Sequence, residues 1–299
     1  MAGSGVRGVR ILKEVPKTEV LFNDINPSAI KLIKKNLKSN KLKANVGNKD
    51  LRLLFAENRC AFDFIDIDPF GSPAKFLESA AFAMKKKSFL AVTATDTGAL
   101  AGSFPEACMR KYGLTVARTD FYKELGVRAL LTSIQRAFAK YDMAFRPALV
   151  HSNHFFRVFG FVEKGKQKAD KIMEKIFNLT YCQKCLYRNY SLEVNCPECK
   201  SKTNIIGPIW SGEIYDWNFV KKVNAELEGR KFKTRFIEEA DTVPYYDIHD
   251  LCKANSKAAK KMEVIIAALK KKGYRVSRTN FCPTGLKTDA PLTAVRSSL

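Results

Sequence analysis

Two hydrophobic patterns alternate along the first 160 residues of the chain. Short apolar runs at 19–22, 61–68 and 89–94 predict buried strands, and a β-rich stretch covers 155–163. A helix is predicted from Pro27, with Asn26 as its N-cap, and further helices at 72–84 and 128–140. Strands that alternate with helices indicate βαβ units, so we expect an α/β fold with a parallel sheet and helices on both faces.

The pattern changes near residues 164–166, a charged junction that we take as a domain boundary. The first domain would span 1–164. A second, smaller α+β domain would span 165–299, with a cysteine-rich module at about 180–202. At about 245–280, two predicted helices (the second at 257–272) and a strand favour a winged-helix-like unit with a basic face. A lysine-rich, solvated helix is the alternative interpretation of that segment.

The net charge is the most informative feature of the composition. The 299 residues include 52 Lys and Arg against 30 Asp and Glu, a formal net charge of +22. Solubility needs far less, so the excess indicates a polyanionic partner, nucleic acid first of all; a lysine-biased proteome is the alternative. No apolar run approaches the roughly 18 residues that span a bilayer, and the start lacks the apolar core of a signal peptide. We expect a cytoplasmic protein with no membrane association and no obligate protein partner.

A glycine pattern opens the chain. Gly3, Gly5 and Gly8 have the Gly-x-Gly-x-x-Gly spacing of loops that let the backbone approach a nucleotide cofactor closely. Asp24 ends the next predicted strand, where its carboxylate could accept hydrogen bonds from ribose hydroxyls. NAD, FAD and S-adenosylmethionine all suit this geometry, and a tight turn with incidental glycines is the alternative. Asp50 could bind an adenine amine beyond a third strand, or be a solvated loop residue.

The stretch Asp-Ile-Asp-Pro-Phe-Gly-Ser-Pro at 66–73 follows a predicted buried strand, at the edge where open α/β sheets bind ligands. It resembles the Asn/Asp-Pro-Pro-Tyr/Phe signature of enzymes that methylate exocyclic amines on bases. A carboxylate and a backbone carbonyl beside a rigid proline can accept the N–H bonds of such an amine and localise its lone pair, while an aromatic ring stacks on the base. The base would have to be flipped into the pocket. Asp-Pro-x-Gly is also a common turn sequence.

Four of the eight cysteines form two knuckles, Cys182-x-x-Cys185 and Cys196-Pro-x-Cys199, separated by ten residues. This spacing is typical of a zinc ribbon, in which both knuckles hold one tetrahedral metal ion. A closed four-thiolate site has no open coordination position, so the zinc would be structural. Free thiols are the alternative for these four, and the other cysteines show no such pattern.

Several motifs together resemble one family. The segments 23–27, 68–73, 95–97 and 283–291 look like those of the tRNA guanine-26 N2-dimethyltransferases, and the resemblance covers nearly the whole chain. It implies a class I S-adenosylmethionine-dependent methyltransferase domain, which is Rossmann-like, and a C-terminal tRNA-binding domain with a zinc ribbon. The implied reaction adds one and then two methyl groups to the N2 amine of guanine 26, giving N2-methylguanosine and N2,N2-dimethylguanosine.

The resemblance also implies roles for single residues. Asp68 would be the catalytic carboxylate, Pro69 would contribute its carbonyl, and Phe70 would hold the base. The cofactor would be lined at its methionine end by Gly3 and Gly5, at its ribose by Asp24 and at its adenine by Asp50. Asp96 is a further pocket candidate with no assigned role.

One departure from the family concerns the N-terminus. The family carries a segment before the glycine loop, including the first strand of the sheet, which this sequence lacks; we therefore expect an N-terminally truncated version. The alternatives are another base-amine methyltransferase acting on RNA, a non-catalytic RNA-binding protein, and a nucleotide-dependent oxidoreductase with the same glycine loop. The oxidoreductase leaves the 68–70 motif, the paired cysteines and the charge unexplained.

Overall fold

A four-stranded sheet forms the centre of the computed structural model, which describes residues 1–228, 236–240 and 242–299. The strand order is β3-β4-β6-β5, and the bounds are β3 (Phe62–Ile67), β4 (Met84–Ala94), β6 (Phe156–Lys164) and β5 (Met143–Ser152). β3 and β4 are parallel, but β6 is antiparallel to both of its neighbours. Our prediction of a parallel sheet is therefore wrong for β6 and its two neighbours. Only three residues separate β5 from β6, which allows a hairpin and no crossover.

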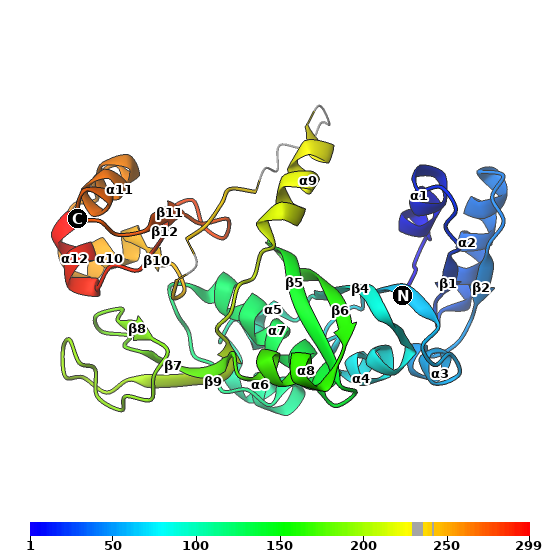
Figure 1. Ribbon diagram of the computed structural model, residues 1–299, viewed down its shortest axis with the longest axis horizontal. Helices are drawn as coiled ribbons and strands as arrows, with labels where there is room; N and C mark the ends of the chain where they lie inside the picture. Colours follow the sequence, from blue (N-terminus) through cyan, green and yellow to red (C-terminus); the bar gives the residue numbers. More distant parts are fainter. Residues whose placement is uncertain (229–235, 241) are drawn as a thin grey trace.

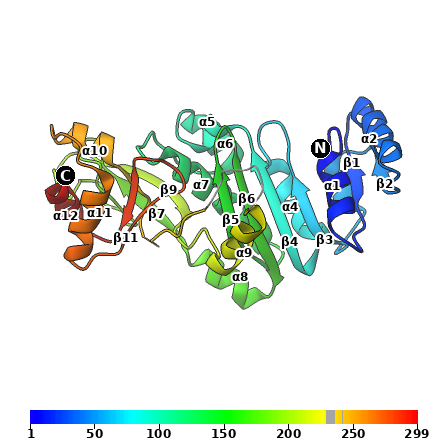
Figure 2. The same ribbon diagram turned by 90° about the horizontal axis from the view of Figure 1, so that it is seen from above.

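Helices cover both faces of this sheet, as expected. On one face α7 (Tyr122–Ala139) packs between α4 (Ala74–Ala83) and α8 (Lys166–Met173). On the other face lies α9 (Trp217–Leu227), whose Phe219 contacts the rings of Phe89 and Phe161 (Figure 2). The main apolar core lies on the α7 side, where Leu90 and Val92 of β4 are completely buried. Within the described residues, no helix is both long and apolar enough to cross a bilayer.

The first fifty residues form a small lobe at one end of the molecule (Figure 1). β1 (Leu21–Asn23) and β2 (Asn45–Gly47) pair in parallel, and α1 (Val6–Glu14) and α2 (Pro27–Ser39) pack against them around a separate core that includes Phe22 and Ile33. The predicted N-cap is confirmed, since the Asn26 side chain accepts a hydrogen bond from Ser28 N at 2.9 Å. Among the described residues no strand ladder joins β1 to β3. The expected strand ahead of residue 1 concerns sequence outside this chain and stays a prediction.

The C-terminal part occupies the opposite end (Figure 1). One sheet has the order β8-β7-β9 and another the order β10-β12-β11. The predicted helix over 257–272 starts later, as α11 (Met262–Lys271): the chain turns at Ser256, which has φ +52°, and residues 257–261 are non-helical. The domain limits stay predictions, although β6 ends and α8 begins next to the proposed boundary. The remaining elements are α3 (Leu51–Ala56), α5 (Thr97–Leu100), α6 (Pro105–Tyr112), β7 (Ile176–Tyr181), β8 (Arg188–Asn189), β9 (Asn204–Trp210), β10 (Tyr246–Asp247), α10 (Ile248–Ala254), β11 (Val276–Arg278), β12 (Gly285–Thr288) and α12 (Leu292–Ser298).

Salt bridges between buried groups join α7 to the C-terminal strands. Glu124 of α7 binds Arg128 at 2.8 Å and Lys287 of β12 at 3.0 Å. Just before α7, Asp120 binds Arg188 of β8 at 2.7 Å. All five side chains are at most 2% exposed, and we call them the buried ion network. α7 itself begins at Tyr122, six residues earlier than the apolar pattern predicts, so that Glu124 lies within it.

Candidate functional site

The predicted catalytic segment leaves β3 at its carboxyl end, and the end of β4 holds it in place. Gly71 N donates a hydrogen bond to Thr95 Oγ1 at 2.6 Å, and Thr95 N donates to Gly71 O at 3.1 Å. Gly71 has φ +86°, a left-handed conformation that favours glycine. Pro69 is buried, whereas the Phe70 side chain is fully exposed. The structure thus presents Phe70 to solvent from a short, tied loop.

Two arginines meet the carboxylates at this edge. Arg7 of α1 donates to Asp68 Oδ2 at 2.9 Å and to Asp66 Oδ2 at 2.5 Å. Arg157 of β6 donates to both oxygens of Asp66, at 2.9 and 3.1 Å, and to the Thr93 hydroxyl. We call Arg7–Asp68 the outer pair, with side chains 52% and 31% exposed, and Arg157–Asp66 the inner pair, at 13% and 16%. The predicted catalytic carboxylate is therefore the more accessible of the two.

Two glycines of the opening loop adopt backbone conformations that favour glycine. Gly3 and Gly5 have φ of +54° and +75°, in the left-handed region. A Cβ on Gly8 would lie 2.4 Å from the Phe22 ring, so α1 packs against β1 at a distance only glycine permits. A Cβ on Gly3 would meet no atom within 4 Å, which leaves its backbone open to a ligand.

Asp24 lies directly against this loop. Its carboxylate accepts hydrogen bonds from Gly3 N and Asn26 N, both at 2.9 Å. Burial alone would raise the pKa of Asp24, but these hydrogen bonds and the N-terminal ammonium group outweigh it and hold the pKa below its usual range. Asp24 is therefore an ionised acceptor beside open backbone, which fits a ligand that carries hydroxyl groups.

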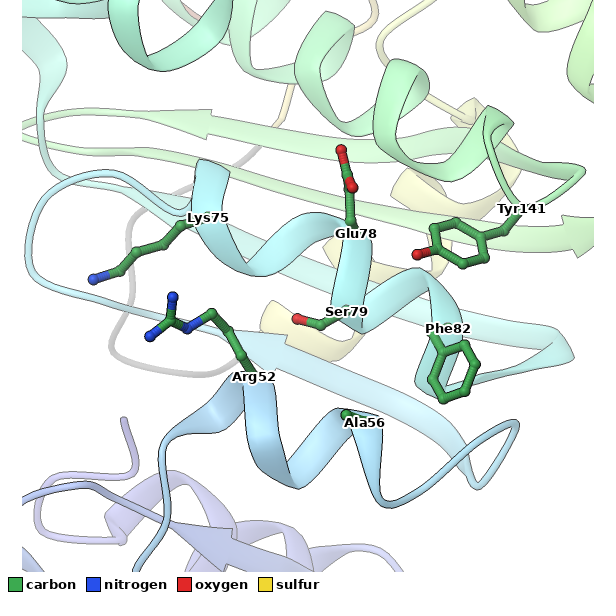
Figure 3. A pocket seen from close by; sticks show the side chains of 7 residues that line it. All are labelled: Arg52, Ala56, Lys75, Glu78, Ser79, Phe82 and Tyr141. Carbon is green, nitrogen blue, oxygen red and sulfur yellow. The ribbon is translucent and has the colours of Figure 1, made fainter.

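Asp50 is the N-cap of α3, and its carboxylate accepts hydrogen bonds from the Arg52 backbone and guanidinium. The side-chain hydrogen bond from Arg52 is the main reason that the pKa of Asp50 falls to about 2. Arg52 also lines a cavity of about 390 Å³ between α3 and α4 (Figure 3). There Arg52 and Lys75 lie at one end, and Phe82 lies at the other. None of the predicted site residues lines this cavity.

Asp96, for which the sequence suggested no role, is anchored near the end of β4. Tyr112 OH donates to Asp96 Oδ1 at 2.7 Å, and Lys111 Nζ lies 3.1 Å from Oδ2. Burial, together with the hydrogen bond to Asp96 and the charge of Asp96, raises the pKa of Tyr112 well above its usual value, so the hydroxyl stays a donor. These contacts connect α5 and α6 to the site edge.

The four paired cysteines converge. Their Sγ atoms all lie within 4.8 Å of one another, and three of the four residues are buried. Across the two knuckles, Cys182 and Cys199 Sγ are 3.5 Å apart, and Cys185 and Cys196 Sγ are 3.4 Å apart. Four clustered thiols without carboxylate or imidazole fit a soft metal ion in a closed tetrahedral site. The residues thus fit structural zinc.

Sequence reasoning missed both arginines of the site. Arg7 stands inside the glycine pattern, where attention goes to the glycines. Arg157 is a charged residue within the apolar run Phe-Arg-Val-Phe-Gly-Phe-Val, which is itself a signal, because a strand interior seldom holds an unpaired charge. Its partner Asp66 could not be identified, since 91 residues separate the two.

Comparison with known proteins gives a family. The profile of the N2,N2-dimethylguanosine tRNA methyltransferases matches residues 1–299. Curated tRNA (guanine(26)-N(2))-dimethyltransferases are similar: that of Archaeoglobus fulgidus is 38% identical over 97% of this chain and 83% of its own length. The Methanobrevibacter smithii enzyme is 36% identical over 98% of this chain and 81% of its own length.

A solved structure agrees. Trm1 from Pyrococcus horikoshii, in complex with S-adenosyl-L-methionine, superposes with a TM-score of 0.90 at 33% identity. The match covers all of this chain and 86% of that one. The fold is thus that of a class I methyltransferase with a C-terminal extension, as the sequence predicted. The chain belongs to the N2,N2-dimethylguanosine tRNA methyltransferase family.

Proposed function

We propose that this protein transfers methyl groups from S-adenosylmethionine to the N2 amine of guanine 26 in tRNA. The products are N2-methylguanosine and then N2,N2-dimethylguanosine. The observation that carries the proposal is the Asp68-Pro69-Phe70 segment at the carboxyl end of β3, in a chain that matches the family over its whole length. Arg7, which stands within the glycine pattern, donates a hydrogen bond to Asp68 and so connects the glycine loop to the 68–70 segment.

Three residues would act on the base. Phe70 offers an exposed ring on which a flipped guanine stacks, an interaction worth about 1–3 kcal/mol. Asp68 accepts a hydrogen bond from the N2 amine, which localises the nitrogen lone pair; the carboxylate then stabilises the positive charge that develops on the nitrogen and takes the proton that the amine loses as the new N–C bond forms. The Pro69 carbonyl accepts the other N–H bond. The partly exposed position of Asp68 supports this role, because a base can reach it from solvent.

The lobe at residues 1–50 would hold the methyl donor. S-adenosylmethionine, when bound, supplies an electrophilic methyl group. Gly3 and Gly5 would face its methionine end, because backbone at Gly3 is open to a ligand. Asp24 would accept hydrogen bonds from the ribose hydroxyls. Asp50 would accept a hydrogen bond from the adenine amine once Arg52 releases one oxygen of the Asp50 carboxylate.

Exposed lysines at both ends of the molecule would bind the tRNA backbone. Lys31, Lys34, Lys35 and Lys38 form the outward face of α2; Lys270 and Lys271 end α11, and Lys272 follows as its C-cap. Because each phosphate contact releases counterions, tRNA affinity should fall steeply as salt rises. The cytoplasmic location expected from the sequence stays a prediction.

The cysteine cluster would hold one structural zinc ion per chain through Cys182, Cys185, Cys196 and Cys199. Its knuckles lie next to the buried ion network, since Arg188 also donates to Leu186 O. Metal analysis of the purified chain should give one zinc, and Cys196→Ser should lose it.

Methyl transfer to two tRNA transcripts tests the function. One transcript carries guanine at position 26 and its matched control carries adenine. Digestion and mass spectrometry should find methylated and dimethylated guanosine only from the first. Transfer to both transcripts would indicate a base-amine methyltransferase with another target. Binding of tRNA without any transfer would support the non-catalytic RNA-binding alternative.

A further inference from the structure

We propose that Arg7 selects the target base: on guanine binding it releases Asp68 and donates a hydrogen bond to the guanine O6. This makes Arg7 a specificity-determining residue of the site that the proposed function already uses, and the inference rests on that function. It starts from one observation: the Asp68 carboxylate, which is proposed to accept a hydrogen bond from the guanine amine, already accepts one from the exposed Arg7.

The outer pair can exchange partners while the inner pair stays. Arg7 and Asp68 are 52% and 31% exposed, so an incoming base can reach the contact between them. Arg157 and Asp66 are mostly buried, and Arg157 also donates to Thr93 and lies 4.8 Å from the Phe159 ring centroid. The inner pair is therefore a fixed frame on which the outer pair moves.

Arg7 remains attached when it releases Asp68. A guanidinium carries five N–H donors on a rigid plane, and Asp66 and Asp68 accept from different nitrogens, Nη1 and Nη2. Losing the contact at Nη2 leaves the one between Nη1 and Asp66 Oδ2 at 2.5 Å. The freed Nη2 donors stay near Asp68, because Nη1 remains bound to Asp66, two residues away in the same segment.

The edge of guanine is complementary to this arrangement. Along its Watson–Crick edge, guanine presents the N2 amine and N1–H as donors and O6 as an acceptor. Asp68 is acceptor-only when ionised, and Arg7 is donor-only. A guanine that donates hydrogen bonds from its N2 amine and its N1–H to Asp68 therefore brings O6 toward the freed Nη2 of Arg7. Adenine has no C2 amine and presents an acceptor at N1, which would face the Asp68 carboxylate.

The test uses tRNA transcripts that differ by one base. One has guanine at position 26; the other has 2-aminopurine, which keeps the C2 amine but lacks O6 and N1–H. Arg7→Met removes every donor at similar length, and Arg7→Lys retains a single-point donor. Arg10→Met is the matched control, because Arg10 lies on the same helix and pairs with Glu14. For each protein we measure kcat/KM and, without the methyl donor, the dissociation constants of both transcripts.

The wild-type protein should prefer guanine, and Arg7→Met should reduce that preference about tenfold or more, the usual loss for a charged hydrogen bond. Arg7→Lys should retain an intermediate preference, and Arg10→Met the full one. Because the loss of N1–H is common to all proteins, the change in preference reports on O6. Thermal unfolding should show Arg7→Met folded, since Arg157 still holds Asp66.

Failure of this inference differs from failure of the proposed function. If wild-type protein methylates guanine 26 but Arg7→Met keeps the same preference, Arg7 does not read O6 and the inference is overturned. If no protein transfers a methyl group, the proposed function fails, and the binding constants decide alone. An equal ratio of the two dissociation constants in wild type and Arg7→Met would then overturn the inference.

Discussion

The site at the end of β3 and the buried ion network beside α7 are built from the same chemical groups, carboxylates held by arginines and lysine. In the outer pair of the site the side chains are 52% and 31% exposed, whereas in the network none exceeds 2%. Water can replace a partner that leaves the outer pair. In the network a lost partner leaves a charge buried without compensation, which is costly. Burial therefore separates a contact that can exchange during a reaction from one that fixes two parts of the chain.

The largest expected effect is on the rate of the exposed site. Asp68→Asn keeps the shape of the side chain but removes the charge that stabilises the reacting amine. Methyl transfer to guanine 26 should fall by about 10²–10⁴-fold. The free energy of unfolding should change by less than about 1 kcal/mol, because the pair is half-exposed. Large changes in both rate and stability would show that the outer pair is structural, and would contradict the distinction between the outer pair and the buried ion network.

Glu124→Gln should show the opposite behaviour. The substitution removes the carboxylate that pairs with buried Arg128 and the nearer of the two carboxylates around buried Lys287, whose other partner Glu239 lies 3.6 Å away, so the free energy of unfolding should fall by about 3–5 kcal/mol. Urea denaturation at neutral pH measures this, and calorimetry measures S-adenosylmethionine affinity at a temperature where the variant is folded. That affinity should be nearly unchanged, since the glycine loop lies in the lobe at the opposite end of the molecule from the C-terminal strands that the network joins (Figure 1). A loss below about 1 kcal/mol would mean that the network does not hold the parts together.

The buried network should also respond to acid. Burial alone would raise the pKa of Glu124, but Lys287 and Arg128 outweigh it and hold the pKa below its usual range. The stabilisation is therefore complete above the unfolded-state pKa of about 4.3 and is lost as pH falls through the folded-state value. Below about pH 4.3, wild type should lose stability faster than Glu124→Gln, by up to about 1.4 kcal/mol per pH unit. Parallel curves for the two proteins would contradict this assignment.

The smallest effect is expected at an exposed pair outside both regions. Lys85 and Asp63 lie 2.7 Å apart on β4 and β3, but their side chains are 45% and 75% exposed. Asp63→Asn should change the free energy of unfolding by no more than about 0.5 kcal/mol, and less at high salt. The value gives the baseline against which Glu124→Gln is judged. A loss of stability comparable to that of Glu124→Gln would show that exposure does not determine how much an ion pair stabilises this protein.

The sequence determined the local parts of this protein, because they depend on neighbours along the chain. Glycine spacing set the left-handed turns at Gly3 and Gly5, Asn26 capped α2, and two knuckles placed four thiols within reach of one metal. The family motifs likewise stood in short continuous stretches.

Only the tertiary structure decided which distant groups meet. Periodicity could not reveal that β6 runs antiparallel to β4, since a strand pattern carries no direction. It could not pair Arg157 with Asp66, or Glu124 with Lys287 across 163 residues. The energy of a charge depends on its burial and its partner, and both are properties of the folded chain. For that reason the sequence was enough to predict Asp68 as a site residue, whereas only the folded structure showed that Arg7 lies beside it.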